Sequence, residues 1–347
     1  MKKIFVNFPI IMVVLLSMVF VGNAWGKDTK GKILLRLNTS VDAAGIAAGH
    51  PPAASVDAFM KYIKAHGNKI FNMKVFFSNQ LAAKLDQTLP ALKTGAFEIG
   101  NDGYGNCGGM TSAMMPLNLP FLLSTFGQAE RFWDGPVGKR MRAKFEKDMG
   151  MKVMWNVYIG FRHITNSKRP IHVPADLKGL KIRTMNDPYQ METFAALGAS
   201  PTPLAFSELF TAMQQGLVDG QENPISNVYI KKMYEVQKYL TKTGHTFTWG
   251  LYFTSQKWWN SLTPEAQAIL TKAGEAAEKA SLASLKTIEA WMEKEIIKKG
   301  MEVYTPNKKQ LKQFRKACGK VYKNIEAKMG SKQFNEVLQA AENALNQ

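Results

Sequence analysis

Hydrophobic side chains along this chain follow two spacings, one typical of strands and one typical of helices. Short runs rich in valine, isoleucine, leucine and phenylalanine predict strands at residues 32–38, 70–78, 96–101, 152–165, 179–185 and 217–223, the last passing into a loop. Apolar side chains three or four positions apart predict helices at residues 53–67, 84–95, 187–198, 207–216 and 263–300. Because strands and helices alternate, we expect an α/β fold with helices on both faces of a sheet.

Residues with special backbone preferences mark several of these predicted ends. Asp187 and Ser207 are expected to cap the starts of their helices, because short polar side chains accept hydrogen bonds from the first free N–H groups. Gly198 and Gly216 are expected to end the same two helices. Pro90 marks a break in the second predicted helix, since proline cannot donate a backbone hydrogen bond.

A glycine-rich segment, GNDGYGNCGG at residues 100–109, follows the third predicted strand. In open α/β sheets, ligands usually bind at the carboxyl ends of strands. We therefore expect a loop near a binding site here. The segment lacks the GK[ST] ending of a phosphate-binding loop, so a phosphate cradle is weakly supported.

The helix predicted at residues 263–300 is unusually long. It starts with Thr263 as a cap and Pro264 in the first turn, and no further proline interrupts it. At roughly 1.5 Å per residue it could approach 50 Å, more than one ordinary domain needs. A coiled coil is the alternative, but the alanine-rich, uncharged stripe favours burial against two domains.

The N-terminal sequence predicts a leader for export. MKK supplies positive charge, an apolar run follows from about residue 9 to residue 21, and Ala24 and Gly26 form a small-residue cleavage pattern. The run is shorter than the roughly 20 residues of a membrane span. We expect removal after Gly26 and release into the periplasm, with a retained anchor helix as the alternative. The remaining chain of about 320 residues suggests two domains.

Positive charge is the main compositional bias, with 45 lysines and arginines against 27 acidic residues and a net charge of +18. The net charge is +16 once Lys2 and Lys3 leave with the leader, because 43 basic and 27 acidic residues remain. Such a balance is compatible with nucleic acid, a membrane surface or acidic ligands. Because the lysines are scattered over helix faces and the chain is predicted to be exported, we favour solvated helix faces and expect no nucleic-acid partner.

Motifs for covalent or cofactor chemistry are missing from the sequence. It has no GxSxG elbow, no Walker loop and no GxGxxG opening a helix, and its histidines and cysteines lack metal-site spacing. Glu208, Asp219 and Glu222 are conceivable catalytic carboxylates, but roles in a helix first turn or a loop turn are favoured. We therefore expect no enzyme activity, no cofactor and no metal. Export permits a disulfide between Cys107 and Cys318, and the sequence leaves their pairing open.

Two long stretches carry a family resemblance. GFRHITNSKRPIHVPADLKGLKIRTMND begins at residue 160, and FAALGASPTPLAFSELFTAMQQGLVDGQENPISNVY begins at residue 194. In order and spacing they resemble the solute-binding subunit of tripartite ATP-independent periplasmic (TRAP) transporters, the DctP-type family. A looser resemblance, which includes SNQLAAKLD and LPFLL, extends over nearly the whole exported chain.

The resemblance implies a type II-like periplasmic binding protein, in which two α/β lobes surround a ligand cleft. Crossing strands and one long helix would join the lobes. Lobe 1 would comprise residues 27–158 and about 248–285, and lobe 2 residues 159–247 and about 286–347. The implied function is that of a monomeric receptor that delivers a small organic carboxylate to a TRAP membrane permease. A sensory protein that presents the acid to a membrane signalling receptor is the alternative.

The resemblance also implies which residues hold the ligand. Arg183, in the GLKIR motif, would form a bidentate salt bridge with the ligand carboxylate, and Arg162, in the GFR segment, would be a second arginine. Asn223 would add an amide donor, and Phe206 would pack over the ligand. Two arginines in one cleft repel each other unless an anion joins them, so we expect an open form that closes on the acid.

The first lobe departs from the family pattern. Ala82 and Ala83 follow the QL motif, where the family commonly has glycine and then a polar or acidic residue. Aromatic side chains in the predicted lobe hint at a large or aromatic ligand, but the identity of the acid stays open. Candidate pocket walls, each as compatible with a core or loop role, are Asn38, Asp102, Tyr104, Trp155, Trp249 and Tyr252.

Overall fold

The N-terminal part of the fold is a parallel pair of strands joined through a helix. The computed structural model describes residues 26–107 and 110–347, so the predicted leader lies outside the described residues except for its last position. β1 (Ile33–Asn38) and β2 (Phe71–Phe76) pair in parallel, and α1 (Pro51–Tyr62) lies between them in the chain. The hydrophobic pattern predicted all three elements, and they are confirmed.

The next helix, α2 (Leu85–Thr94), continues through Pro90, so the predicted break is wrong. Proline removes one helical hydrogen bond. Leu89 and Leu92 nevertheless bury one face of the helix, and such packing supplies most of the stability of a short helix. The helix ends at Gly95, whose backbone is left-handed with φ 76°.

The third strand begins later than predicted. β3 (Gly100–Gly103) pairs antiparallel with β9 (Phe247–Ser255), while Ile99 makes an isolated parallel bridge to β1. A 3₁₀ turn, Tyr104–Cys107, follows. As far as it is described, the glycine-rich segment is therefore strand and turn rather than loop, because its first residues find hydrogen-bond partners in β9.

A larger mixed sheet has the strand order β10-β8-β4-β7-β5-β6, and β9 pairs with both β4 and β3. Its further strands are β4 (Met151–Asn166), β5 (Lys181–Thr184), β6 (Ser200–Pro203), β7 (Gly220–Pro224), β8 (Tyr239–Thr241) and β10 (Glu302–Tyr304). The first half of β4 pairs with β9, and its last residues pair with β7 and β8. β4 and β9 are therefore the crossing strands that the sequence predicted.

The two predicted helix caps in this part of the chain have different outcomes. Asp187 caps α5 (Pro188–Ala196), because its carboxylate accepts hydrogen bonds from two backbone N–H groups. The predicted cap by Ser207 is wrong. The chain first makes a 3₁₀ turn at Phe206–Glu208, and α6 (Leu209–Gln214) begins after it without a side-chain cap.

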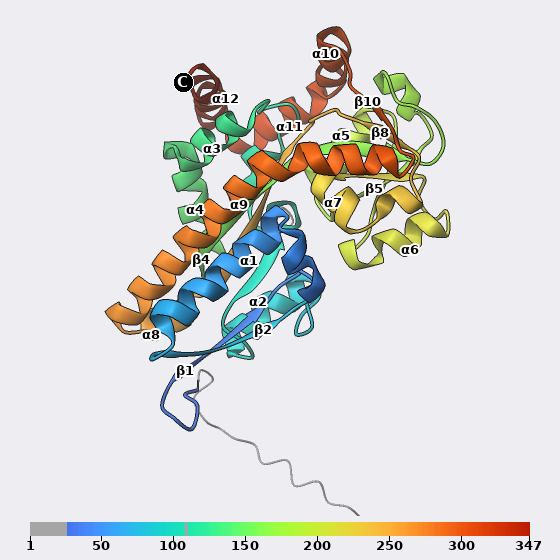
Figure 1. Cartoon of the computed structure of the whole chain (residues 1–347). Coiled ribbons are helices and arrows are strands. Elements are labelled where there is room, and N and C mark those ends of the chain that lie inside the picture. Colours follow the sequence, from blue (N-terminus) through green and yellow to red (C-terminus); the bar gives the residue numbers. More distant parts are fainter. Residues whose placement is uncertain (1–25, 108–109) are drawn as a thin grey trace, which may run out of the picture.

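The long predicted helix is confirmed as α9 (Pro264–Lys298), and the Thr263 side chain caps it. Figure 1 shows α9 extending across the molecule, with α1 beside it. Ala273 and Ala277 belong to the core that includes α1, whereas the more distal part of α9 packs with α7 (Ile225–Ile230). One helix thus links two cores of the same chain, and it packs on β4 and α1 instead of forming a coiled coil.

Three C-terminal helices complete the fold at the top of the molecule in Figure 1. The helices not yet named are α3 (Phe126–Asp134), α4 (Pro136–Met149), α8 (Gln256–Ser261), α10 (Lys308–Ala317), α11 (Gly319–Met329) and α12 (Ser331–Asn346). α12 packs on α3 and α11 packs on α5. The end of the chain therefore packs on α3, which precedes β4 in the sequence, and on α5, which follows it.

Both cysteines are buried free thiols, which settles the pairing that the sequence left open. Cys107 ends the 3₁₀ turn after β3, and Cys318 lies between α10 and α11. Burial raises the pKa of the Cys318 thiol to about 12 and that of Cys107 well above its ordinary value. Both sulfurs therefore stay protonated and act as apolar core groups.

Gly274 should be essential where α9 crosses β4. A Cβ at this position would lie 2.5 Å from the backbone carbonyl oxygen of Met154. Gly274→Ala should therefore lower the free energy of unfolding by about 1–3 kcal/mol, although alanine normally favours a helix. Urea unfolding measures the change. Gly319→Ala in α11, where no atom lies within 4 Å of the added carbon, is the matched control, and equal stability of both variants would contradict this close crossing.

Candidate ligand-binding site

Three neighbouring strands carry the polar residues that the sequence analysis selected. Arg162 lies on β4, Asn223 on β7 and Arg183 on β5, and β7 is the strand between the other two. In register, Gln221 stands beside Arg183. Because side chains alternate between the faces of a strand, Asn223 shares the face of Arg183 and Glu222 takes the other.

Arg162 is neutralised inside the protein by Glu222. Both side chains are buried, Nη2 of Arg162 lies 2.7 Å from Oε1 of Glu222, and Nε donates to the other carboxylate oxygen. His245 completes the group, with its Nε2 3.1 Å from Glu222 Oε2. Burial alone would raise the pKa of Glu222, but the charge of Arg162 and hydrogen bonds from His245 and Arg162 hold it below its usual value. Glu222 is therefore a buried counterion, and the turn role favoured from the sequence is wrong.

Arg183, in contrast, is buried with no carboxylate beside it. Only 2% of its surface is exposed, and Nε and Nη2 both donate to the carbonyl oxygen of Leu204, at 2.9 and 2.6 Å. Among the described residues, none of the recorded ion pairs includes it. Burial, together with the nearby charge of Arg162, lowers the pKa of the guanidinium to about 10, and the charges of Glu222 and Glu208 offset only part of this shift. A buried cation without a counterion costs several kcal/mol.

Asn223 is held in place by neighbouring amides. Its Nδ2 donates to Oε1 of Gln221 at 2.5 Å, and its Oδ1 accepts from Nδ2 of Asn227 at 2.9 Å. Gln221 is itself fixed, since its Nε2 donates to the Thr165 hydroxyl at 2.9 Å. An amide nitrogen carries two N–H groups, so Asn223 keeps a second donor on the face that it shares with Arg183.

Phe206 belongs to the turn that also fixes Arg183. The Leu204 carbonyl, which accepts both hydrogen bonds from the guanidinium, lies two residues before Phe206. The ring is half-buried in the 3₁₀ turn between β6 and α6. Nζ of Lys231 lies 5.9 Å from the ring centre. One short segment therefore positions the aromatic side chain, the cation and a second charged group.

Two ion pairs beside this turn join the halves of the molecule on either side of β4. Lys231, after α7, pairs with Asp42, after β1, at 2.8 Å. Lys84, before α2, lies 3.8 Å from Glu208, before α6. All four side chains are at least one-third exposed, so each pair contributes little to stability. Sequence analysis missed these pairs because their members lie far apart in the chain, 189 positions for Lys231 and Asp42, and leave no local pattern.

The polar candidates from the first half, Asn38 and Asp102, hold backbone segments. Nδ2 of Asn38 donates to the carbonyl of Ala82 at 2.9 Å, and its Oδ1 accepts the N–H of Leu81 at 3.1 Å. Asn38 thus fixes the segment in which this chain departs from the family pattern. Asp102 accepts Nδ2 of Asn106 at 2.6 Å, and burial raises the pKa of its carboxyl to about 6.

The four aromatic candidates are buried and contact one another in two groups. Trp155 stacks on Tyr252 with ring centres 4.3 Å apart. The ring centres of Trp249 and Trp133 lie 5.3 Å apart in a stacked arrangement, and the ring centres of Trp249 and Tyr104 lie 6.2 Å apart in an edge-to-face arrangement. The indole N–H of Trp249 has no recorded hydrogen-bond partner among the described residues. These contacts are those of core residues, and a role in the pocket stays a prediction.

The chain thus has two α/β halves joined by crossing strands, and a buried arginine, Arg183, lies on an inner strand of the sheet. This arrangement is that of a type II-like periplasmic binding protein. The family model for bacterial extracellular solute-binding proteins, family 7 (DctP), matches residues 43–329. The chain therefore belongs to the DctP family, the solute-binding proteins of TRAP transporters, which are not enzymes.

Similar proteins agree with this assignment. The chain is 33% identical over 245 residues to a solute-binding protein of Verminephrobacter eiseniae, covering 70% of this chain and 71% of that one. It is similar to the sugar acid binding protein of Advenella mimigardefordensis in complex with galactonate, with TM-score 0.83, 26% identity, and 90% and 99% of the two chains covered. A TRAP solute-binding protein of Ralstonia eutropha with bound acetolactate gives TM-score 0.82 and 27% identity, covering 89% and 99%.

Glu222→Gln should leave Arg162 buried without its counterion. We expect the free energy of unfolding to fall by about 3–5 kcal/mol, because an uncompensated charge remains in the core. Urea unfolding measures the loss. Glu208→Gln removes the carboxylate of the exposed pair with Lys84 and is the matched control, with an expected change below about 1 kcal/mol. If both variants lost an equally small amount of unfolding free energy, burial of the Arg162 charge would not depend on Glu222.

His50 and His163 should each contribute a loss of stability as the pH is lowered, because burial makes both side chains resist protonation. Burial lowers the pKa of His163 to about 3 and that of His50 to about 4, from 6.5 for a free side chain. Below pH 6.5 the two histidines bind protons in the unfolded chain but stay neutral in the folded chain until the pH reaches their lowered pKa values. Each histidine then costs about 1.4 kcal/mol per pH unit, down to its folded pKa.

Urea unfolding at a series of pH values tests this dependence. Between pH 6.5 and about 3, the slope of the unfolding free energy against pH should be less positive in His163→Gln than in the natural protein by about one proton, because the variant lacks a group that takes up its proton only in the unfolded chain. The Nδ1 of His163 accepts the N–H of Gly244 at 3.1 Å, and the glutamine carbonyl can replace that acceptor. The same slope for the variant and the natural protein would contradict a neutral, buried His163.

Proposed function

We propose that this protein is an extracytoplasmic receptor that binds a small organic carboxylate between two lobes and delivers it to a TRAP membrane permease. Membership of the solute-binding family supports the general function. The proposal adds the residues that hold the acid, the movement that encloses it and the partner that receives it.

The contrast between the two buried arginines carries the proposal. Arg162 has an internal counterion in Glu222, whereas the recorded partner of the Arg183 guanidinium within residues 26–107 and 110–347 is a carbonyl oxygen. A guanidinium edge and a carboxylate fit each other in plane, and the resulting hydrogen bonds are strengthened by charge. A ligand carboxylate at Arg183 would supply the anion that the protein itself does not.

Arg183 and Asn223 together would recognise the carboxylate group of the ligand. They lie on adjacent strands and share a face, so a carboxylate can accept from the guanidinium and from the free N–H of the amide. Phe206, at the edge of the same turn, would cover the ligand chain. Galactonate and acetolactate, bound in the two similar structures, are both carboxylates and support this class.

The two lobes that we propose are residues 27–158 with about 248–285, and residues 159–247 with about 286–347. β4 and β9 cross between them and α9 extends along both, which supports a hinge in these three elements. The pairs Lys231–Asp42 and Lys84–Glu208 connect the lobes at the rim. They would form on closure and break on opening, and closure removes the carboxylate from water.

Delivery to a permease requires a receptor outside the cytoplasm. The apolar run and the small residues before Lys27 support export through a leader of 26 residues. In residues 26–107 and 110–347 no helix is long and apolar enough to cross a membrane. The membrane step would therefore fall to partner subunits, a proposal supported by the similar solved structures that are TRAP solute-binding proteins.

Arg183→Ala should abolish tight binding of the acid. A thermal-shift panel of organic acids first identifies a ligand, and titration calorimetry then measures its affinity. We expect a loss of about 2–5 kcal/mol in binding free energy, because the charged partner of the carboxylate is gone. Arg183→Lys should also be impaired, since an ammonium cannot form the planar pair.

The matched control is Arg140→Ala, which removes an exposed guanidinium that pairs with Glu336. Its affinity should equal that of the natural protein. An unchanged dissociation constant for Arg183→Ala would remove Arg183 from the site. Near-normal affinity for Arg183→Lys would argue against bidentate geometry.

A further inference from the structure

The C-terminal helices concentrate positive charge on one part of the molecule. Residues 308–332, which span α10, α11 and the start of α12, contain a single acidic residue, Glu326. Their basic residues form what we call the C-terminal basic surface: Lys308, Lys309, Lys312, Arg315, Lys316, Lys320, Lys323, Lys328 and Lys332. This segment therefore supplies an excess of eight positive charges, half of the sixteen expected for the exported chain.

These nine side chains are exposed and lack acidic partners. All nine residues belong to the exposed class, and none of the ion pairs recorded for the described residues includes one of them. Some lysines on other helices do have acidic partners, since Lys144 pairs with Asp148 and Lys286 with Glu130. The concentration of charge thus corrects the expectation that the lysines are scattered along the chain, whereas their exposure agrees with the expected solvated helix faces.

The helices orient this charge away from the core. Phe314 in α10 and Val321 and Ile325 in α11 are buried, so the basic side chains take the remaining faces. Within α10, Lys308, Lys312 and Lys316 recur every four residues and lie along one side. Like charges at this spacing destabilise a helix by a few tenths of a kcal/mol per pair. An external anion would offset that repulsion.

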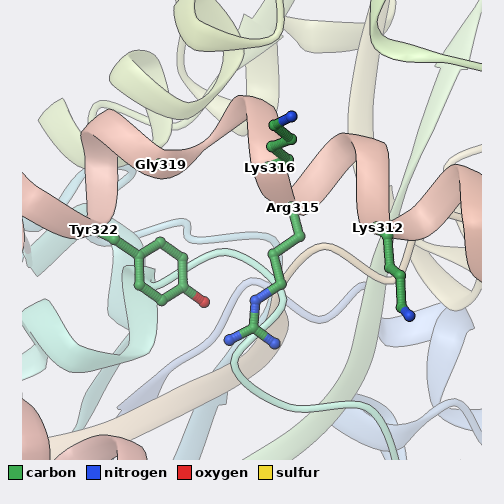
Figure 2. Close-up of a pocket in the computed structure, with 5 residues that line it drawn as sticks. All are labelled: Lys312, Arg315, Lys316, Gly319 and Tyr322. Carbon is green, nitrogen blue, oxygen red and sulfur yellow. The ribbon is translucent and has the colours of Figure 1, made fainter.

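A shallow hollow on this surface has the composition of an anion site. Figure 2 shows it between α10 and α11, with the guanidinium of Arg315 pointing toward Tyr322. The hollow measures about 360 Å³ and is lined by Lys312, Arg315, Lys316, Gly319 and Tyr322, with no acidic residue among them. Arg315 lies 5.6 Å from the centre of the Tyr322 ring. The Tyr322 hydroxyl donates to the Pro120 carbonyl, so the ring is a fixed wall.

We propose that the C-terminal basic surface binds the anionic headgroups of a membrane surface. Protein interfaces have aromatic and apolar residues at their centre and are depleted of lysine. Here lysine dominates, and the large exposed apolar residues of the described chain (Leu81, Met110, Leu217, Trp291, Ile297 and Leu345) all lie outside residues 308–332. Such a surface fits diffuse attraction to lipid phosphates, which raises membrane affinity roughly fivefold for each lysine or arginine near the bilayer.

This attraction would give the receptor a way to stay near the permease. A protein attracted to the bilayer surface searches for a membrane partner within a thin layer instead of the whole compartment. The interaction is electrostatic and is screened beyond about 10 Å at moderate salt, so binding stays reversible. The carboxylate site is built from other residues, and the two functions can therefore be separated by mutation.

Vesicle sedimentation tests the proposal on the exported chain. The natural protein should bind vesicles of mixed phosphatidylglycerol and phosphatidylcholine at low salt, should be released by added salt, and should ignore pure phosphatidylcholine vesicles. A variant with Lys312→Gln, Lys316→Gln, Lys320→Gln and Lys323→Gln should bind the anionic vesicles at least about tenfold more weakly. Its thermal shift with the carboxylate ligand should be unchanged, which shows that it is folded and active.

The matched control removes the same charge elsewhere. Lys64, Lys69, Lys93 and Lys272 are exposed lysines outside the C-terminal basic surface, and changing all four to glutamine should reduce vesicle binding by less than about threefold. An equal loss in both quadruple variants would overturn the proposal, since net charge alone would then decide. Absence of vesicle binding by the natural protein, or binding only to the isolated permease, would also overturn it.

Discussion

The buried guanidinium of Arg183 is the constraint on which the rest of this site depends. A cation out of contact with water needs an anion, and the protein offers it one carbonyl oxygen from Leu204 instead. The depressed pKa of Arg183 reflects that cost. Arg162, on the other side of β7, meets the same requirement internally through Glu222. Two arginines of similar burial thus have different roles, and only one is left for an external carboxylate.

The architecture around these strands serves to fix and to cover that cation. β7 lies between the strands of the two arginines, and its amides are held by side chains of the same face. The segment that carries Phe206 also supplies the hydrogen-bond acceptor for Arg183, so a change in this segment would move the guanidinium. Exposed pairs such as Lys231 with Asp42 contribute little to stability and would break at little cost in the lobe opening that we propose. The hydrogen bonds that fix the site are buried, whereas the ion pairs between the two halves are exposed and weak.

Local patterns in the sequence predicted the fold better than they predicted the contacts. Thr263 and Asp187 act as caps because a cap needs only neighbouring backbone, whereas Ser207 fails because the chain tightens into a 3₁₀ turn first. Pro90 was misjudged because burial of the helix face outweighs one lost hydrogen bond. The motif predicted ligand contacts for both Arg162 and Arg183. The pairing of Glu222 with Arg162 alone depends on strand order. No spacing along the chain encodes that order.

A crystal structure with the acid that the ligand panel identifies tests the central claim most directly. The account predicts a carboxylate in the plane of the Arg183 guanidinium, within hydrogen-bond distance of two of its nitrogens and of the Asn223 amide, while Arg162 keeps Glu222. A carboxylate bound to Arg162 in place of Glu222, or held by the first half of the chain with Arg183 still on the Leu204 carbonyl alone, would contradict it.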